Sequence, residues 1–310
     1  MNMNSFPTIP ATELRIELRH ITLAAKAWGN PANPPMLVLH GWLDNAGSFD
    51  RLAPLLGSHY VVALDLAGHG SSDWRPAGSW YAYIDYLDDI AEVLDHFGWS
   101  CIDLLGHSLG GTLASVFAAA FPERVQRMIL IEALGPLTAP AERSLAQLRS
   151  GLQARRTAHE KSLRVFPSLE AAIDIRRKAS GLSDIAAHCI VARGTEPVDA
   201  PEERPAKSGS AVSVEIETSG FRWSSDPRLT LPSVQRFTEA QILSVLSGIE
   251  AKTLMILAEP ATSYLPSEIM DARAAAVTDI VTRRLPGTHH LHLEDPLPVA
   301  YAINAFLGDV

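Results

Sequence analysis

The chain has 310 residues, of which 47% are hydrophobic and 20% are charged. This length allows a large buried core, in one elaborated domain or in two small ones. The formal net charge of −9 argues against a nucleic-acid partner, because a negative surface repels polyanions.

Neither residues 1–10 nor any apolar run indicates export or a membrane span. Residues 1–10 lack a basic patch followed by an apolar stretch, and no apolar run approaches the roughly 18 residues that span a bilayer. We therefore expect a cytoplasmic protein without a membrane partner. The cysteines, Cys101 and Cys189, form no metal or disulfide framework, and we expect Cys101 to be buried inside a strand.

The first part of the chain contains predicted strands followed by a helix. Residues 14–19 alternate with period two and residues 21–27 continue as an extended segment, which predicts an N-terminal hairpin. The short apolar runs 36–39 and 60–64 favour strands covered on both faces. A helical pattern follows over residues 83–97.

The next apolar runs continue this alternation. Residues 101–105 predict a strand, a helix of small residues follows, and residues 128–131 predict another strand. The same pattern returns with strands at 253–257 and 280–285 and a closing helix. Alternation of buried strands with helices predicts an α/β fold with a mainly parallel sheet and helices on both faces.

The interval between the strands 128–131 and 253–257 has a different pattern. It contains helical stretches near residues 141–160 and 168–178. Residues 197–210 are rich in Pro, Glu, Ala and Ser, and we expect them to be a mobile connection. After them, a strand-like alternation precedes a candidate hairpin partner; these two segments are residues 212–217 and 220–223.

These patterns predict one core interrupted by an insertion. The core comprises residues 1–135 and 251–310. A mostly helical cap, residues 136–250, is inserted after the strand that ends near Ile131. Its length is in line with small accessory domains.

A candidate nucleophile lies where the strand 101–105 meets the following helix, in the motif Gly106-His107-Ser108-Leu109-Gly110. A G-x-S-x-G sequence between a strand and a helix is typical of a sharp turn that exposes the serine hydroxyl. The glycines let the helix pass close to the strand. A serine in an ordinary glycine-rich turn is the alternative, but the order of elements favours a nucleophile at Ser108.

A serine nucleophile needs partners from elsewhere in the chain. Its hydroxyl is weakly reactive at neutral pH, so attack on a carbonyl requires a neutral histidine that removes the proton. That histidine needs an acceptor that fixes its tautomer and stabilises the imidazolium. Eleven histidines are available, and we expect His69 and His107, which adjoin tight turns, to pack rather than to act as the base.

Two further polar segments are interpreted as structural. Gly68 and Gly70 permit a tight turn, and Asp44 or Asn45 is expected to cap the helix that follows. We expect neither segment to be catalytic.

Four segments, in their order along the chain, resemble the α/β-hydrolase superfamily. They are His40-Gly41-Trp42, residues 65–71, the turn at Ser108, and residues 287–296. The segment 220–228 is similar to one of the serine hydrolase-like subgroup. The resemblance implies an α/β-hydrolase fold with an inserted cap.

The resemblance also implies where the base lies. In this family the histidine occupies the loop between the last strand and the last helix, and a glutamate five residues later and then a proline follow it. His289, Glu294 and Pro296 match this pattern. The resemblance therefore implies His289 as the base, with His290 as the alternative if the loop is shifted by one residue, whereas His292 is expected to pack.

The acid of the triad departs from the commonest family pattern. After the strand 253–257 the family carries a glycine and then an aspartate, whereas this chain reads Ala258-Glu259-Pro260 and has no aspartate before Asp271. Some members carry the acid after the strand that follows the nucleophile helix, where this chain has Glu132. Carboxyl ends of parallel strands face one crevice. Glu132 is therefore preferred, with Glu259 as the alternative.

Acyl transfer concentrates negative charge on oxygen, which preorganised backbone amides stabilise. The resemblance implies that these amides belong to Trp42 and Leu109. Haloalkane dehalogenases and epoxide hydrolases of this fold carry an aspartate where this chain has Ser108, and the serine points to acyl chemistry.

We therefore expect a carboxylesterase-type serine hydrolase that acts on a small-molecule acyl substrate through an acyl-enzyme. We expect no cofactor and no metal, because the chain lacks a Walker loop and zinc-ligand spacing. A homo-oligomer is compatible with the sequence. The alternatives are a C–C bond hydrolase of the same fold and a non-catalytic binding protein that retains the fold.

Overall fold

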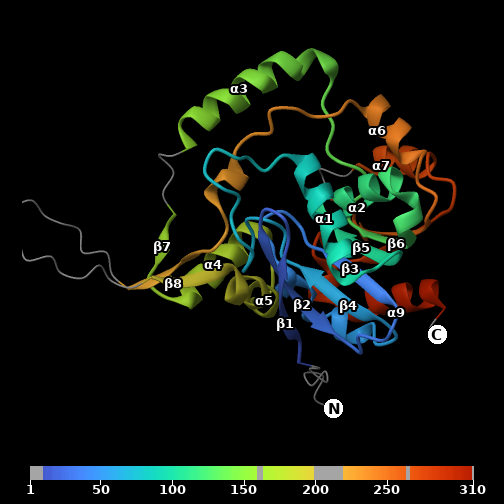
Figure 1. Ribbon diagram of the computed structural model, residues 1–310, viewed down its shortest axis with the longest axis horizontal. Coiled ribbons are helices and arrows are strands. Elements are labelled where there is room, and N and C mark those ends of the chain that lie inside the picture. Colours follow the sequence, from blue (N-terminus) through green and yellow to red (C-terminus); the bar gives the residue numbers. More distant parts are fainter. Residues whose placement is uncertain (1–9, 159–162, 199–218, 263–265, 309–310) are drawn as a thin grey trace, which may run out of the picture.

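A computed structural model of the protein describes residues 10–158, 163–198, 219–262 and 266–308. An eight-stranded sheet with helices on both faces forms one part, and a second part with its own three-stranded sheet lies beside it (Figure 1). The predicted strand 212–217 and most of the predicted connection 197–210 lie outside the described residues.

The large sheet has the order β1-β2-β4-β3-β5-β6-β10-β11. β1 pairs antiparallel with β2 and β2 with β4, and all other pairs are parallel. The mainly parallel sheet and the N-terminal hairpin are thus confirmed. The strands are β1 (Thr12–Glu17), β2 (Thr22–Trp28), β3 (Pro35–Leu39), β4 (Tyr60–Leu64), β5 (Ile102–His107), β6 (Val125–Ile131), β10 (Lys252–Glu259) and β11 (Ile280–Pro286).

Two hydrophobic cores lie on opposite faces of this sheet, since successive strand residues point to opposite sides. Leu37 of β3 packs in one core with Leu113, whereas the neighbouring Val38 packs in the other with Ile303. Continuous apolar runs of this kind are typical of parallel strands covered on both faces. The prediction for Cys101 was wrong, because β5 begins one residue later and leaves this thiol exposed at the end of the sheet.

Helices and short turns supply the other half of each core. On one face lie α1 (Tyr83–Phe97), α2 (Leu109–Ala120), α6 (Glu239–Leu246) and α7 (Ser267–Ala274). On the other lie α9 (Pro296–Leu307) and the 3₁₀ turns η1 (Ala46–Phe49) and η2 (Ala53–Leu55). None of the helices in the described ranges has the length and apolar character needed to cross a membrane.

The second part of the molecule lies between β6 and β10 in the sequence. β9 (Gly220–Trp223) pairs with β7 (Val165–Phe166) and β8 (Thr195–Val198), and the predicted pairing of residues 220–223 with 212–217 lies outside the described residues. Its helices are α3 (Ser144–Arg156), α4 (Leu169–Ser180) and α5 (Asp184–Gly194), the last of which the sequence analysis missed.

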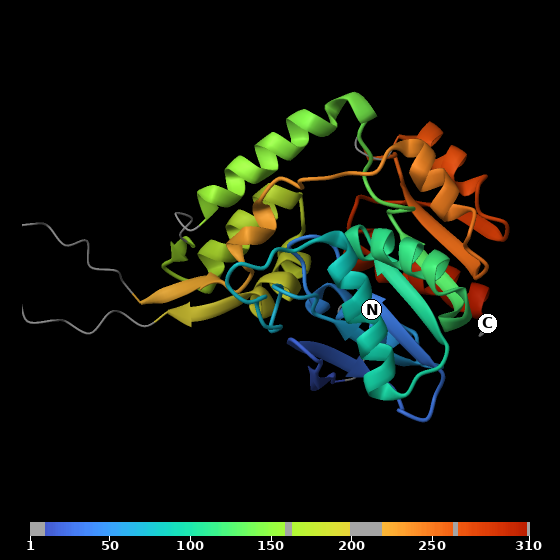
Figure 2. The ribbon, with the colours of Figure 1, turned by 45° about the horizontal axis from the view of Figure 1, so that its top comes forward.

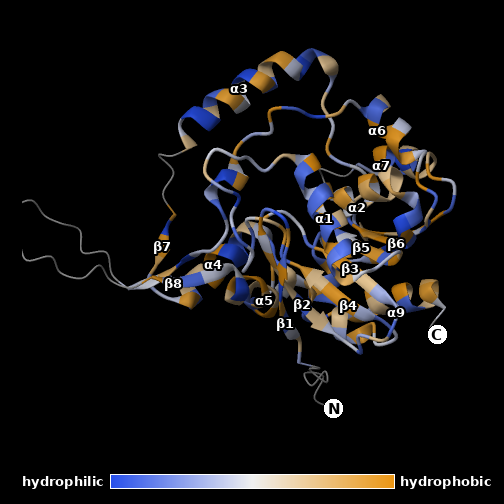
Figure 3. Ribbon diagram, in the orientation of Figure 1, coloured by the Kyte–Doolittle hydropathy of each residue, from blue (hydrophilic) through white to orange (hydrophobic). Residues whose placement is uncertain are grey.

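α3 runs along the outer side of this second part (Figures 1 and 2). Apolar and polar residues alternate along it (Figure 3), and Leu145, Leu148 and Leu152 are exposed. α6 also falls within the predicted cap range 136–250, yet it packs against α2 beside the large sheet. The limits of the cap stay a prediction.

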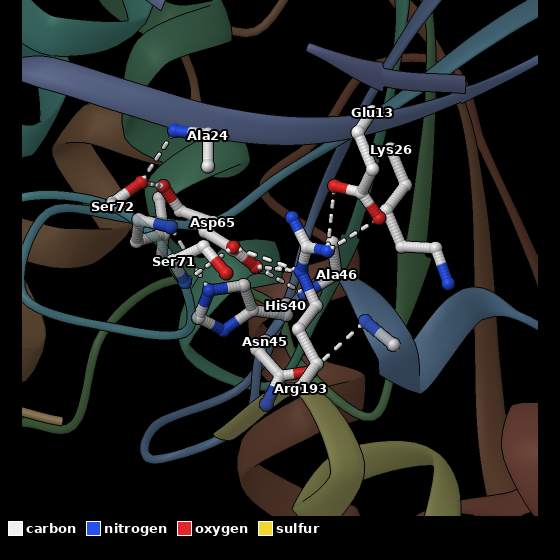
Figure 4. A network of polar contacts seen from close by, with 12 residues as sticks. Glu13, Ala24, Lys26, His40, Asn45, Ala46, Asp65, Ser71, Ser72 and Arg193 are labelled. Carbon is white, nitrogen blue, oxygen red and sulfur yellow. Dashed lines mark hydrogen bonds and ion pairs between the residues drawn. The ribbon is translucent and has the colours of Figure 1, made fainter. Parts of the chain in front are cut away.

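A polar network ties α5 to the large sheet (Figure 4). Asp65, in the loop after β4, is fully buried and accepts hydrogen bonds from the amides of Ala46 (2.7 Å) and Ser71 (2.8 Å). Arg193 of α5 donates from Nε to Asp65 at 2.9 Å and contacts Glu13 of β1 at 2.8 Å. The carboxylate is therefore both paired and hydrogen-bonded, as a buried charge must be.

Candidate active site

Ser108 lies in a tight turn between β5 and α2. Its φ is 50° and its ψ is −114°, a backbone conformation that residues other than glycine rarely adopt. The Ser108 amide donates a hydrogen bond to the Ile131 carbonyl at the end of β6, at 3.0 Å. The turn therefore holds the serine at the edge of the sheet where the parallel strands end.

The glycines of the motif are a steric requirement of this turn. A Cβ at Gly106 would lie 2.4 Å from the backbone of Gly110, and a Cβ at Gly110 would lie 2.1 Å from the Leu39 carbonyl oxygen. A side chain at either position would push α2 away from the sheet.

Glu132 and His289 contact each other beside this turn. Glu132 directly follows β6 and is 2% exposed. Its Oε2 lies 3.2 Å from His289 Nδ1, and its Oε1 accepts a hydrogen bond from the Ala258 amide at 2.5 Å. Thr262 Oγ1 also donates to Oε2, at 3.2 Å. An imidazole that donates from Nδ1 keeps a lone pair on Nε2, which is the form a general base requires.

One cavity of about 770 Å³ is lined by all five residues for which the sequence predicts a role in the site. They are Trp42, Ser108, Leu109, Glu132 and His289. The volume is within the range of small-molecule sites, about 300–1,000 Å³.

The second part of the molecule supplies much of the cavity wall. Leu229, Leu231 and Phe237 line it from the segment after β9. The Trp42 indole donates a hydrogen bond to the Leu229 carbonyl at 3.1 Å, so it also links the loop after β3 to that segment. Access to Ser108 therefore depends on residues outside the large sheet.

Backbone strain is concentrated at this cavity. Among the described residues, Leu43, Ser108 and Glu132 are the non-glycine positions with positive φ, at 58°, 50° and 54°. All three line the cavity. Such conformations cost about 1–3 kcal/mol each and persist where the surrounding structure enforces them, often at functional sites.

Leu109 and Trp42 lie at the same edge of the sheet and line the same cavity. Leu109 is the first residue of α2, and the first amides of a helix have no acceptor within the helix. Trp42 lies in the loop after β3, a strand that pairs with β5. The Gly110 amide donates to the His40 carbonyl at 3.0 Å and so ties this loop to the start of α2.

Residues 34–259, most of the chain, match the family described as the alpha/beta hydrolase fold. The chain belongs to this family. The predicted α/β-hydrolase fold is thereby confirmed.

Relatives of this α/β hydrolase place it in the serine hydrolase-like subgroup. The serine hydrolase-like protein of Danio rerio is 31% identical over 307 residues, which cover 96% of this chain and 88% of the relative. The crystal structure of the hypothetical protein PA1622 from Pseudomonas aeruginosa PAO1 has 38% identity and a TM-score of 0.85, over 96% of this chain and 99% of that one. A thioesterase domain from the curacin biosynthetic pathway, 24% identical with a TM-score of 0.77 over 95% of this chain and 99% of that domain, shares the fold.

The alternative acid and base of this α/β hydrolase have different surroundings. Glu259 is exposed at the end of β10. His290 Nε2 lies 3.3 Å from Asp44 Oδ2 and not beside Glu132. Of the two carboxylates that the sequence suggested, Glu132 is the one in contact with His289.

A cluster of histidines behind His289 was not predicted. The His107 ring centroid lies 4.2, 4.7 and 5.1 Å from those of His292, His289 and His290. Burial lowers the pKa of His107 well below its usual 6.5, and the neighbouring histidines lower this pKa further. His107 Nε2 donates a hydrogen bond to the His289 carbonyl at 2.8 Å.

Asp44 belongs to this cluster and is not a helix cap. The side chain of Asn45 makes the cap, accepting a hydrogen bond from the Gly47 amide at 2.9 Å. Asp44 pairs with Arg176 of α4 and with His290. Burial raises the pKa of Asp44, but the hydrogen bond and charge of His290 and the charge of Arg176 outweigh burial and hold it below its ordinary value. Only the run His289, His290 and His292 was visible in the sequence, because Asp44 and Arg176 are distant along the chain.

Proposed function

We propose that this α/β hydrolase cleaves carboxylic esters, or related acyl compounds, of small molecules through an acyl-enzyme on Ser108. The observation that carries the proposal is the contact between Glu132 and His289 in the same cavity as Ser108. A nucleophile, a base and an acid that orients the base are the parts that serine hydrolysis requires.

In the proposed reaction, Ser108 Oγ attacks the acyl carbon while His289 Nε2 removes the hydroxyl proton. Glu132 holds Nδ1 and stabilises the imidazolium. The amides of Trp42 and Leu109 donate to the developing oxyanion, and each such donor typically contributes about 2.7–4 kcal/mol. His289 then protonates the leaving alcohol, and a water molecule that it activates releases the acid. These steps use no cofactor.

The test is hydrolysis of p-nitrophenyl esters of graded acyl length, measured beside covalent labelling by a fluorophosphonate probe. We expect the wild-type protein to turn over the esters and take up the probe, and Ser108→Ala to do neither, because the nucleophile is gone. An exposed serine that is not at the site, Ser247, provides the control variant Ser247→Ala, which should behave as wild type.

Two outcomes would replace the proposal. Turnover of vinylogous diketone acids without turnover of esters would establish a C–C bond hydrolase. Failure of the wild-type protein to react with either substrate class or with the probe would leave a binding protein that retains the fold.

A further inference from the structure

Three residues beside the proposed triad bring metal-ligating atoms together. Asp44 comes from the loop after β3, His107 from the end of β5, and His290 from the turn before α8 (Leu291–Glu294). Asp44 Oδ2, His107 Nδ1 and His290 Nε2 lie within 4.8 Å of one another, and all three residues are buried. None of them transfers a proton in the proposed reaction.

The Nδ1 atom of His107 is a hydrogen-bond acceptor that faces Asp44. A carbonyl oxygen only accepts, so the contact with the His289 carbonyl places the His107 proton on Nε2 and a lone pair on Nδ1. Nδ1 is buried and has no hydrogen-bond partner within the described part of the chain. It faces Asp44 Oδ2 at 3.8 Å, so two acceptors are directed at the same space. A cation here would satisfy His107 Nδ1 and take the place of the proton that His290 Nε2 donates to Asp44 Oδ2.

The spacing of the donor atoms suits a tetrahedral ion. Zinc bonds of about 2.0–2.2 Å place two donors on one tetrahedral ion roughly 3.4 Å apart. Asp44 Oδ2 lies 3.3 Å from His290 Nε2 and 3.8 Å from His107 Nδ1, close to this spacing, and the two histidine nitrogens lie within 4.8 Å of each other.

Gly41 keeps the space between the donors open. A Cβ at this position would lie 3.0 Å from both Asp44 Oδ2 and His107 Nδ1. Gly41, Asp44, His107 and His290 all line the 770 Å³ cavity, so a further ligand position would face solvent or substrate.

The positive charge of Arg176 limits how tightly a cation binds beside Asp44. Arg176 pairs with Asp44 through Oδ1, which leaves Oδ2 directed at the histidines. The guanidinium repels a second cation, so this site should be weaker than a structural zinc site of thiolates.

We propose that Asp44, His107 and His290 bind a divalent transition-metal ion, best matched by Zn²⁺, and that the bound ion suppresses hydrolysis. Two imidazoles and a carboxylate are ligands that Zn²⁺ accepts readily. The ion draws His107 toward Asp44 and His290, and the two histidines directly adjoin Ser108 and His289 in the chain. Because a displacement of about 1 Å at a catalytic group can cost about 10²-fold in rate, we expect hydrolysis to fall at least tenfold. Only the suppression rests on the proposed function.

Calorimetric titration of ZnCl₂ into chelator-treated protein tests the binding. We expect one ion per chain in the wild type and in Ser108→Ala, and a dissociation constant at least tenfold larger in Asp44→Asn and in His290→Asn. The control His96→Asn, at an exposed position of α1, should bind as wild type. Absence of binding to the wild type, or equal binding by both ligand variants, would overturn the site.

Arg176→Gln keeps the test decisive if a ligand variant fails to fold. It retains all three donors and removes the repelling charge, so Zn²⁺ should bind more tightly; unchanged or weaker binding would overturn the proposal.

For suppression, saturating Zn²⁺ should lower ester hydrolysis at least tenfold and EDTA should restore it. Stoichiometric binding with unchanged hydrolysis would refute the suppression. A wild type that binds Zn²⁺ but never hydrolyses an ester would refute the proposed function and leave the site in place.

Discussion

Glu132 combines a strained backbone with a buried, hydrogen-bonded carboxylate. It has a positive φ, its carboxylate is buried, and its oxygens contact the Ala258 amide, Thr262 and His289. The strained backbone and the two donors other than His289 hold the carboxylate in place before any substrate binds. A carboxylate fixed in this way orients an imidazole at no further cost during the reaction.

At this position we predict that Glu132→Gln lowers kcat for an aryl ester by about 10³- to 10⁴-fold with little change in KM. An amide keeps the size of the side chain but no longer stabilises the imidazolium or the correct tautomer. Steady-state kinetics with a p-nitrophenyl ester provide the measurement. The matched variant Glu259→Gln changes an exposed carboxylate and should keep the wild-type kcat. Loss of activity in Glu259→Gln alone would reverse the assignment of the acid.

The sequence signals for Ser108 and His289 are local. Ser108 and its glycines form a continuous motif, and His289 lies in a short recognisable loop. The choice between Glu132 and Glu259 stayed open because both follow strands that end at the same edge of the sheet. The cap predicted at Asp44 or Asn45 is confirmed at Asn45, whereas the contacts of Asp44 could not be predicted because its partners, Arg176 and His290, approach it only in the folded chain.

At the scale of elements, α5 joins the inserted part to the large sheet. A Cβ at Gly47 of η1 would lie 2.3 Å from the Cys189 carbonyl of α5, which shows how closely the two elements pack. The Asn45 amide donates to the Ile190 carbonyl at 2.8 Å, and Arg193 pairs with the buried Asp65. The position of the cavity wall relative to Ser108 depends on these contacts.

We predict that Arg193→Leu lowers the free energy of unfolding by about 3–5 kcal/mol, because it leaves the Asp65 carboxylate buried without its charged partner. Urea unfolding followed by circular dichroism measures the change. Arg222 pairs with Glu196 on the surface, so Arg222→Leu should cost no more than about 1 kcal/mol. Equal small losses in the two variants would show that α5 is not held by this ion pair.

Among elements, the strands of the core could be predicted because the inner strands are buried apolar runs and the edge strand β1 alternates between apolar and polar residues. α5 could not, because it is rich in alanine, is covered by α4, η1 and α8, and so lacks a simple amphipathic pattern. β7 has only two residues, and its partner β9 lies far along the chain. Such pairings leave no local pattern in the sequence.

For the molecule as a whole, buried neutral histidines make stability depend on pH. His69 is fully buried beside the His40 ring, at 5.0 Å between centroids. Burial and then His40 lower the pKa of His69 from 6.5 to about 3. Below pH 6.5 the unfolded chain binds a proton at this residue that the folded chain does not. The folded state therefore loses stability as the pH falls from 6.5 toward about 3.

We predict that His69 lowers the free energy of unfolding by about 1.4 kcal/mol for each unit by which the pH falls between 6.5 and about 3. Urea unfolding at pH 7.5, 6.0 and 5.0 measures it, and His69→Gln should show a correspondingly shallower decline than the wild type. The exposed residue His96 provides the control His96→Gln, which should keep the wild-type decline. An identical pH dependence in His69→Gln and the wild type would contradict the prediction.

The cavity wall and the proposed catalytic residues come from different parts of the chain. Ser108, Glu132 and His289 are placed by the edge of the sheet, whereas Leu229, Leu231 and Phe237 reach the cavity from a separate stretch of chain. In the proposed reaction, replacing these three apolar side chains would alter the room available to the acyl and alcohol parts of the substrate without changing Ser108, Glu132 or His289. The size of the substrate and the chemistry performed on it are therefore set by separate stretches of this chain.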